Sequence, residues 1–218
     1  MDTANDPRIL MAEKCTKDMK NLFNNMRGVG KEASKIMNDI ERKILEIKYS
    51  YAEIDALQSL LKEIESKILE LYELLGGKEW VNRLKRVNID DGRIAKVKFC
   101  MNIIYNLSSR LKLPDDPAYA VDIRIGEIDS VMKHPKADKL KICNVNVGRV
   151  VTVVTNIQNV KEGEKLPVAL LPPAEFFGIV SEGMFLSHNF KEGAPGELPR
   201  LDEDELNNAR KEVLKYLK

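Results

Sequence analysis

The chain has 218 residues, of which 44% are hydrophobic and 32% are charged, a composition that suits a soluble protein of one large domain or two small ones. Its 35 Lys and Arg residues are balanced by 34 Asp and Glu residues, which excludes a whole-molecule cationic field that attracts polyanions. Three scattered cysteines argue against a disulfide framework, and two histidines argue against a metal site. No apolar run reaches the roughly 18 residues that a membrane span needs, and the first residues do not have the pattern of a secretory signal. We therefore expect a cytoplasmic protein.

Residues 7–26 and 31–75 are predicted to be helical. No Gly or Pro occurs within 31–75, and its apolar side chains recur at steps of three and four residues, which places them on one helical face. They are Met37, Ile40, Ile44, Ile47, Tyr51, Ile54, Leu57, Leu61, Ile64, Ile68, Leu71 and Leu75. One unbroken helix is the favoured interpretation. A capping box of Ser50 with Glu53 would instead divide the segment into a hairpin of two helices.

Two further helices are predicted at 79–87 and 91–113, the second with Asp90 or Asp91 as its N-cap. The run Pro-Asp-Asp-Pro then ends helical structure, so residues 114–118 are predicted to be a linker. We therefore expect residues 1–113 to form a helical domain. It is either a helical bundle or a long helical hairpin with the apolar stripe of a coiled coil.

Beyond the linker the period of the sequence becomes that of β-strands. Val121, Ile123 and Ile125 alternate with polar residues, as in a half-buried strand. Further β-rich runs occupy 141–147, 150–155, 166–171 and 184–187, and Pro172-Pro173 is expected to open a longer loop. Five short strands predict a small barrel, and 201–217 predicts a terminal helix capped by Asp202. The predicted fold class is α+β with two domains, 1–113 and 119–218.

Two motifs stand in the second half. Lys-His-Pro-Lys-Ala-Asp-Lys-Leu occupies 133–140, after the first strand, and Gly-Ile-Val-Ser-Glu-Gly-Met occupies 178–184, before the last. With the opening strand 121–128 and the segment 154–165, they resemble the tRNA-binding domain family, which includes stand-alone bacterial tRNA-binding proteins and the endothelial monocyte-activating polypeptide module. The resemblance covers residues 119–190 and implies a five-stranded oligonucleotide-binding (OB) barrel. The whole layout, with its helical front half, resembles predicted archaeal RNA-binding proteins.

In such a barrel, ligands lie across the middle strands between the loops after strands one and four, and both motifs are expected on those two loops. Lysines there would contact phosphates, and His134, if exposed, would stack on a base or donate a hydrogen bond. The candidate RNA-binding residues are Lys133, His134, Lys136, Lys139, Lys141, Asn156, Ser181, Glu182 and Met184. Each alone is more often a solvated or structural residue, and only their occurrence on two adjacent loops favours binding.

The sequence departs from the family where many members have a basic stretch before the second motif. Pro172, Glu175 and Phe177 stand at the basic positions, and residues 119–193 contain nine positive and nine negative side chains. The second domain alone is therefore expected to bind RNA weakly. We expect Phe176 and Phe177 to be buried, either under the barrel's rim or in a subunit interface, and stacking on bases is the alternative.

Positive charge gathers instead in the helical half, at 78–112. The candidate secondary basic face consists of Arg83, Arg86, Arg93 and Lys96. A solvated helix surface explains these residues equally well.

The favoured function is a non-catalytic accessory protein that binds tRNA or another structured RNA by backbone and shape, as a homodimer and with an aminoacyl-tRNA synthetase as a further partner. The alternative is a protein-interaction scaffold that uses the long helix, with the barrel serving oligomerisation. No motif of a phosphate-binding loop, a zinc protease or a serine hydrolase is present, so neither an enzyme nor a cofactor is expected.

Overall fold

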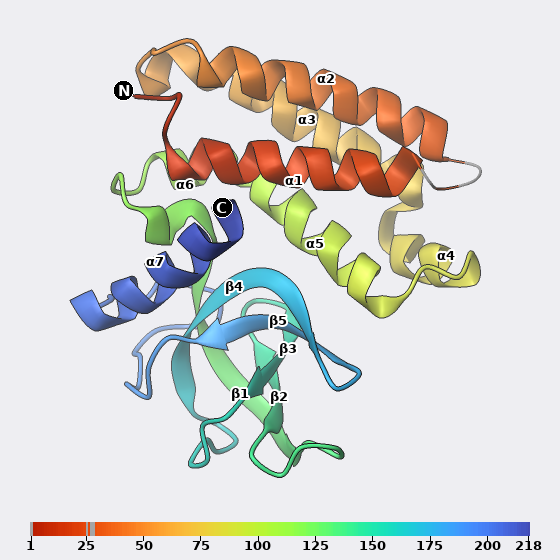
Figure 1. Ribbon diagram of the computed structural model, residues 1–218. Coiled ribbons are helices and arrows are strands. Elements are labelled where there is room, and N and C mark those ends of the chain that lie inside the picture. Colours follow the sequence, from red (N-terminus) through yellow and green to blue (C-terminus); the bar gives the residue numbers. More distant parts are fainter. Residues whose placement is uncertain (1, 25, 27–28) are drawn as a thin grey trace. The chain divides into compact units, whose positions relative to one another are not determined.

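The computed structural model describes residues 2–24, 26 and 29–218, and it divides the chain into one unit that ends at Ala120 and a second that runs from Val121 to Tyr216 (Figure 1). The helices are α1 (Pro7–Asn24), α2 (Gly30–Lys48), α3 (Gln58–Leu75), α4 (Trp80–Arg86), α5 (Asp91–Tyr105), α6 (Leu107–Leu111) and α7 (Glu203–Leu217). The strands are β1 (Ile123–Lys133), β2 (Lys141–Asn146), β3 (Val150–Thr155), β4 (Lys165–Phe176) and β5 (Ile179–Phe185). The predicted helical first half and five-stranded sheet with a terminal helix are confirmed.

The stretch 31–75 forms two helices, so the favoured prediction of one unbroken helix is wrong. After α2 ends at Lys48, Tyr51 adopts a left-handed backbone with a φ of 52°, which no helix continues through. The hydroxyl of Thr3 stabilises this turn, because it donates to Lys48 O (2.9 Å) and accepts from the Tyr51 N–H (3.1 Å). The end of α2 is therefore stabilised by a residue that is distant in sequence but belongs to the same unit.

The capping box of Ser50 with Glu53 does not start the second helix. Ser50 Oγ donates to Ile47 O (2.8 Å), and the chain re-enters helical structure as a 3-10 turn at Ile54–Leu57 with Glu53 as its N-cap. The apolar stripe is nevertheless correctly placed: its α2 and α3 members are buried, and α2 and α3 pack against each other (Figure 1).

The predicted helix 91–113 is also interrupted. Asp90 caps α5 by accepting the Arg93 N–H (2.8 Å), as predicted. At Asn106 the backbone leaves helical geometry, and the short α6 follows. The prediction of a single helix here is wrong. The sequence did not indicate the break, because neither Gly nor Pro lies at it.

A buried arginine ties the start of α1 to the end of α6. Arg8 Nη2 forms an ion pair with Asp6 (2.5 Å), and both side chains are almost fully buried. Arg8 Nη1 donates to the carbonyls of Leu113 (2.7 Å) and Pro114 (3.1 Å). These carbonyls follow the last turn of α6, where no continuing helix supplies N–H donors. The guanidinium of Arg8 donates to them instead.

The sheet of the second unit is antiparallel and has the order β3-β2-β1-β4-β5. It curls so strongly that its two edge strands, β3 and β5, lie side by side. Its interior contains Ile128, Cys143, Val145, Val147, Val151, Val153, Val160, Leu166, Val168, Leu170 and Phe185. Because the edges meet, little unpaired strand edge is left exposed.

Pro172-Pro173 lies inside β4, so the prediction that it opens a loop is wrong. The register between β4 and β5 shifts between Leu170 and Ala174, and the two prolines occupy this irregular stretch. A bulge is the place in a strand where the missing N–H of proline costs least. As a result β4 extends to Phe176, and the second motif forms β5 itself rather than the loop before it.

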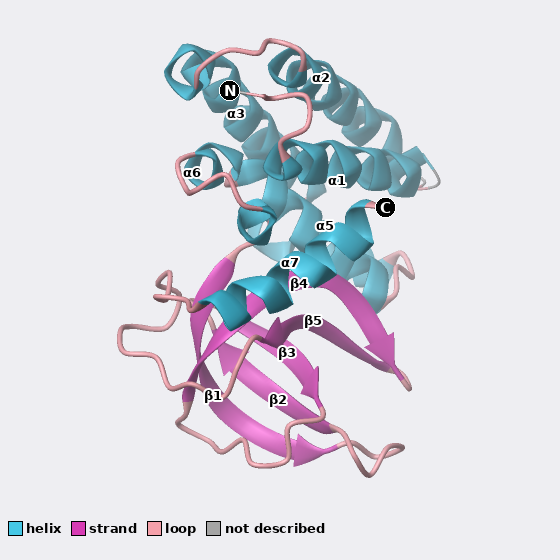
Figure 2. Cartoon of the chain, turned by 60° about the vertical axis from the view of Figure 1, so that its left-hand side comes forward, coloured by secondary structure: helices cyan, strands magenta, loops and turns pink. Residues whose placement is uncertain are grey.

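Helix α7 lies beside β5 (Figure 2), and the buried carboxylate of Glu205 joins its first turn to the segment that follows β5. Asp202 caps the helix in a capping box with Glu205, which confirms the predicted cap. Burial alone raises the pKa of Glu205. Hydrogen bonds from Lys191 Nζ (2.8 Å), Ser187 Oγ (2.5 Å) and the Asp202 N–H (3.0 Å) outweigh burial and hold this pKa below its usual value of 4.5.

Substituting Glu205 by Gln is expected to lower the free energy of unfolding by about 2–3 kcal/mol at neutral pH, because charge-assisted bonds in a buried setting are lost. A carboxylate whose folded-state pKa is depressed stabilises the fold above its unfolded pKa, and this contribution disappears as the pH falls through the folded value. The difference between parent and Glu205→Gln should therefore shrink below pH 4.5. Urea titrations across pH measure it, with the exposed Glu192→Gln as control. If the difference in free energy of unfolding between parent and Glu205→Gln did not change with pH, the stabilising role of the ionised Glu205 carboxylate would be contradicted.

Candidate nucleic-acid interface

The first motif forms a tight loop between β1 and β2, and His134 is its buried anchor. The loop closes through backbone bonds from His134 N–H to Leu140 O (3.0 Å) and from Leu140 N–H to Ala137 O (2.9 Å). His134 Nδ1 accepts the Lys136 N–H (3.1 Å), so its proton resides on Nε2, which donates to Phe176 O (3.0 Å). His134 thereby joins this loop to the β4–β5 hairpin. The residue is only 3% exposed, and contact with RNA was expected only if it were exposed.

The anchored loop leaves three lysines in solvent. Lys133, Lys136 and Lys139 are exposed, and within the described chain none of them forms an ion pair. Lys141 differs from these, because its ammonium group donates to Gln158 O. Gln158 Nε2 in turn donates to Lys139 O (2.9 Å), which joins the first-motif loop to the loop after β3. Sequence reasoning missed Gln158, which becomes identifiable only once β3 is placed beside β2.

The polar residues of the second motif close the sheet. Ser181 Oγ accepts the Val154 N–H of β3 and donates to Gly183 O, both at 3.0 Å, and Ser181 is 4% exposed. A side chain at Gly183 would approach Ala169 O of β4 to 2.7 Å. Glu182 accepts the Thr152 N–H of β3 (3.4 Å), so it too bridges the edge strands. The predicted site residues Ser181 and Glu182 thus have structural contacts that account for them.

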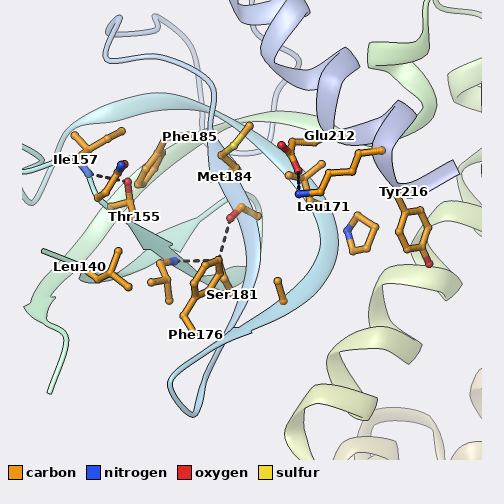
Figure 3. Close-up of a pocket in the computed structure, with 16 residues that line it drawn as sticks. Leu140, Thr155, Ile157, Leu171, Phe176, Ser181, Met184, Phe185, Glu212 and Tyr216 are labelled. Atoms are coloured by element: carbon orange, nitrogen blue, oxygen red, sulfur yellow. Dashed lines mark hydrogen bonds and ion pairs between the residues drawn. The ribbon is translucent and has the colours of Figure 1, made fainter. Parts of the chain in front are cut away.

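A groove of about 650 Å³ lies beside this closure, and it brings parts of both motifs together (Figure 3). Met184 and Asn156 of the predicted site line it, together with Leu140 from the end of the first motif. The full lining is Leu140, Val154, Thr155, Asn156, Ile157, Leu171, Pro172, Ala174, Phe176, Ser181, Gly183, Met184, Phe185, Glu212, Lys215 and Tyr216. The four lysines of the first motif and β2 lie outside this lining. The contribution of α7 was not predicted, because only the folded chain brings that helix beside β5.

Phe176 and Phe177 are exposed in this chain, so the prediction that the barrel's rim buries them is wrong, and their burial in a subunit interface stays a prediction. Phe176 is 38% exposed and lies along the groove, whereas Phe177 is 64% exposed at the hairpin tip. The Phe177 ring meets the edge of the His134 imidazole, with 5.9 Å between ring centroids and an interplanar angle of 68°. The tip is therefore positioned by the same histidine that anchors the lysine loop.

The candidate secondary basic face, in the first unit, is partly neutralised. Arg93 pairs with Asp90 (3.3 Å) and Lys96 with Asp18 (2.8 Å). Arg83 and Arg86 on α4 are exposed.

The chemistry of the buried thiols does not suggest a nucleophile. Burial raises the pKa of Cys143 to about 11 and raises the pKa of Cys15 well above its usual value, so both thiols are protonated at neutral pH. Among the residues that the structure describes, no cluster of three His, Cys, Asp or Glu side chains is arranged to hold a metal ion. In that same part of the chain, every helix is too short or too polar to cross a bilayer.

Comparison with known proteins finds a family model that matches each half of the chain. Residues 123–206 match the family model described as "Putative tRNA binding domain". Over 72 residues the chain is 46% identical to the phenylalanine–tRNA ligase β subunit of Moorella thermoacetica, covering 28% of this chain and 9% of that protein. Over 74 residues it is 38% identical to "Putative tRNA-binding protein YtpR" of Bacillus subtilis, covering 29% of this chain and 37% of the relative. The chain thus corresponds to only a minor part of each relative.

The helical half is matched by a separate model, described as "Alpha helical domain", over residues 1–114. This match covers more than half of the 218 residues. The chain therefore belongs to the family of this alpha helical domain, and that domain is followed by a segment that matches the tRNA-binding domain model.

Proposed function

We propose that this chain is a non-catalytic accessory protein that binds tRNA, with residues 119–218 forming an OB barrel and the lysine loop as its principal contact. The observation that supports this most directly is a set of three exposed lysines, Lys133, Lys136 and Lys139, in a segment matching the tRNA-binding domain model; none of them has a carboxylate partner among the residues that the structure describes. Ammonium groups on a fixed loop contact phosphates without reading bases, so recognition is by backbone and shape.

The partner is a structured RNA, and delivery of tRNA to an aminoacyl-tRNA synthetase belongs to the same proposal. Phenylalanine–tRNA ligase β subunits contain the related segment within a much longer protein. In the present chain, that segment would supply the binding function. Self-association into a homodimer would double the number of lysine loops in contact with RNA.

The alternative function, a scaffold that uses the long helix, loses its main support. Its premise was an apolar stripe free to pair with another helix. The α2 and α3 residues of that stripe are buried within the first unit, so the stripe serves the core of the unit.

The test is the affinity of the whole chain for unfractionated tRNA across a salt series. Three phosphate contacts predict that log K falls with log[salt] with a slope of roughly −2 to −3. The double variant Arg83→Glu/Arg86→Glu should bind as the parent does if the lysine loop is the contact. Affinity no greater than for duplex DNA of similar length, or a flat salt dependence, would contradict the proposal. A loss of binding in the double variant would move the contact to α4.

A further inference from the structure

The tip of the β4–β5 hairpin has an aromatic residue in a backbone conformation that disfavours it. Phe176 pairs with Ile179, so Phe177 and Gly178 alone form the turn, with φ angles of 49° and 94°. Two-residue turns with both φ angles positive favour Asn-Gly, because Asn and Gly tolerate the left-handed region that a bulky side chain resists. Folding alone would therefore favour Asn at position 177.

The Phe177 side chain does not compensate for this strain by burial. It is 64% exposed, and its ring packs in an edge arrangement against His134, the one ring contact found for it among the described residues. Strained residues persist where the surrounding structure enforces them, and they gather at binding sites. The position of Phe177 thus calls for a ligand-binding explanation.

The ring stands next to the lysine loop. The His134 imidazole contacts the Phe177 ring and donates to Phe176 O, both in the hairpin. The same imidazole accepts the Lys136 N–H of the lysine loop, so it joins the hairpin tip to that loop. Figures 1 and 2 show the turn between β4 and β5 and the turn between β1 and β2 at the same end of the sheet. An exposed aromatic face and three unpaired ammonium groups are therefore held in one fixed arrangement.

We propose that Phe177 is a base-stacking residue, which takes an unpaired nucleobase of an RNA whose phosphates contact Lys133, Lys136 and Lys139. A single-stranded nucleic acid is the polymer whose repeating unit combines a flat aromatic face with a negative charge, and this pair of features matches ring and lysines together. The inference rests on the proposed function and adds to it a preference for unpaired bases. His134 acts here as a positioning residue.

Fluorescence of the variant Phe177→Trp tests stacking directly. The natural chain has a single tryptophan, Trp80, which is buried, so the introduced indole reports on the hairpin tip. A short oligouridylate should quench it, whereas a blunt-ended RNA duplex should quench it little. The matched control is Phe190→Trp, because Phe190 is exposed to the same 64% in the same unit, and its indole should not respond.

Affinity supplies the second readout, by anisotropy of labelled oligouridylate. Phe177→Ala should bind it about ten-fold more weakly than the parent does, and Phe190→Ala should bind it equally well. Phe177→Asn separates binding from folding: it relieves the left-handed strain, so its Tm should rise while its affinity falls as for alanine. An unchanged or lower Tm would overturn the strain argument on which the inference depends.

The outcomes distinguish this inference from the function beneath it. If the parent binds tRNA but the Phe177→Trp indole is not quenched and Phe177→Ala keeps its affinity, stacking is overturned and tRNA binding stands. If the parent binds neither tRNA nor oligouridylate, both are overturned. If Phe177→Ala changes the oligomeric state by light scattering while RNA affinity is unchanged, the ring belongs to a protein interface and stacking is again overturned.

Discussion

Replacing Lys133, Lys136 and Lys139 together by Glu is expected to weaken tRNA binding by on the order of 10³-fold at about 50 mM salt. Each lysine that neutralises a phosphate releases counterions, and the gain is largest at low salt. The three side chains are exposed and unpaired in the described chain, so their substitution removes no contact that stabilises the fold. The salt dependence of log K should become shallower by about 2–3 because three contacts are lost.

A charge-matched variant separates local contact from net charge. Lys31→Glu/Lys35→Glu/Lys62→Glu changes three exposed lysines of the helical unit and alters the net charge of the chain by the same amount. It should keep most of the affinity and all of the parental salt slope. Equal losses in the two triple variants would mean that RNA responds to overall charge, and the lysine loop would no longer be assigned as the contact.

The parts of this site that the sequence predicted are those fixed by local chemistry. A Lys-rich turn with Pro135 between two strands is exposed in almost any fold, so the lysines were placed correctly in solvent. The second motif was misplaced because its Gly and Ser residues resemble a loop. In the folded chain, Ser181 supplies the hydrogen bond that a missing ladder partner would otherwise provide, and this role exists only where β3 meets β5.

The errors in the helical half have the same origin in long-range contacts. The stripe from Met37 to Leu75 has a helical period throughout, so one helix was favoured over the alternative hairpin divided at residues 50–53, and the structure has the hairpin. The reversal depends on Thr3, which is distant in sequence. Likewise, burial of Phe177 under the barrel's rim was one of the two expected outcomes, but the side chain is exposed in this chain because β4 extends through Pro172-Pro173 to a hairpin tip.

Substituting Arg8 by Met is expected to lower the free energy of unfolding by about 3–5 kcal/mol, since it leaves a buried carboxylate without its partner. Burial lowers the pKa of Arg8, but the hydrogen bond and charge of Asp6 outweigh it and raise this pKa, so the guanidinium is charged at every working pH. The variant also removes the Arg8 donor from the Leu113 and Pro114 carbonyls, of which Pro114 O keeps the Asp116 N–H. Urea unfolding followed by circular dichroism measures the loss, and Arg86→Met, at an exposed site, should change it by less than about 0.5 kcal/mol.

The ion pair and the carbonyl contacts can be told apart by two more variants. Arg8→Lys keeps the charge but lacks the planar fork that reaches Asp6 and the two carbonyls at once, so it should remain destabilised by about 2 kcal/mol. The double variant Arg8→Met/Asp6→Asn removes the unpaired charge, and it should be more stable than Arg8→Met alone. Recovery in the double variant would identify the stranded carboxylate as the main cost. If instead it is no more stable than Arg8→Met, the cost lies in the carbonyls that end α6, and Arg8 acts chiefly as their cap.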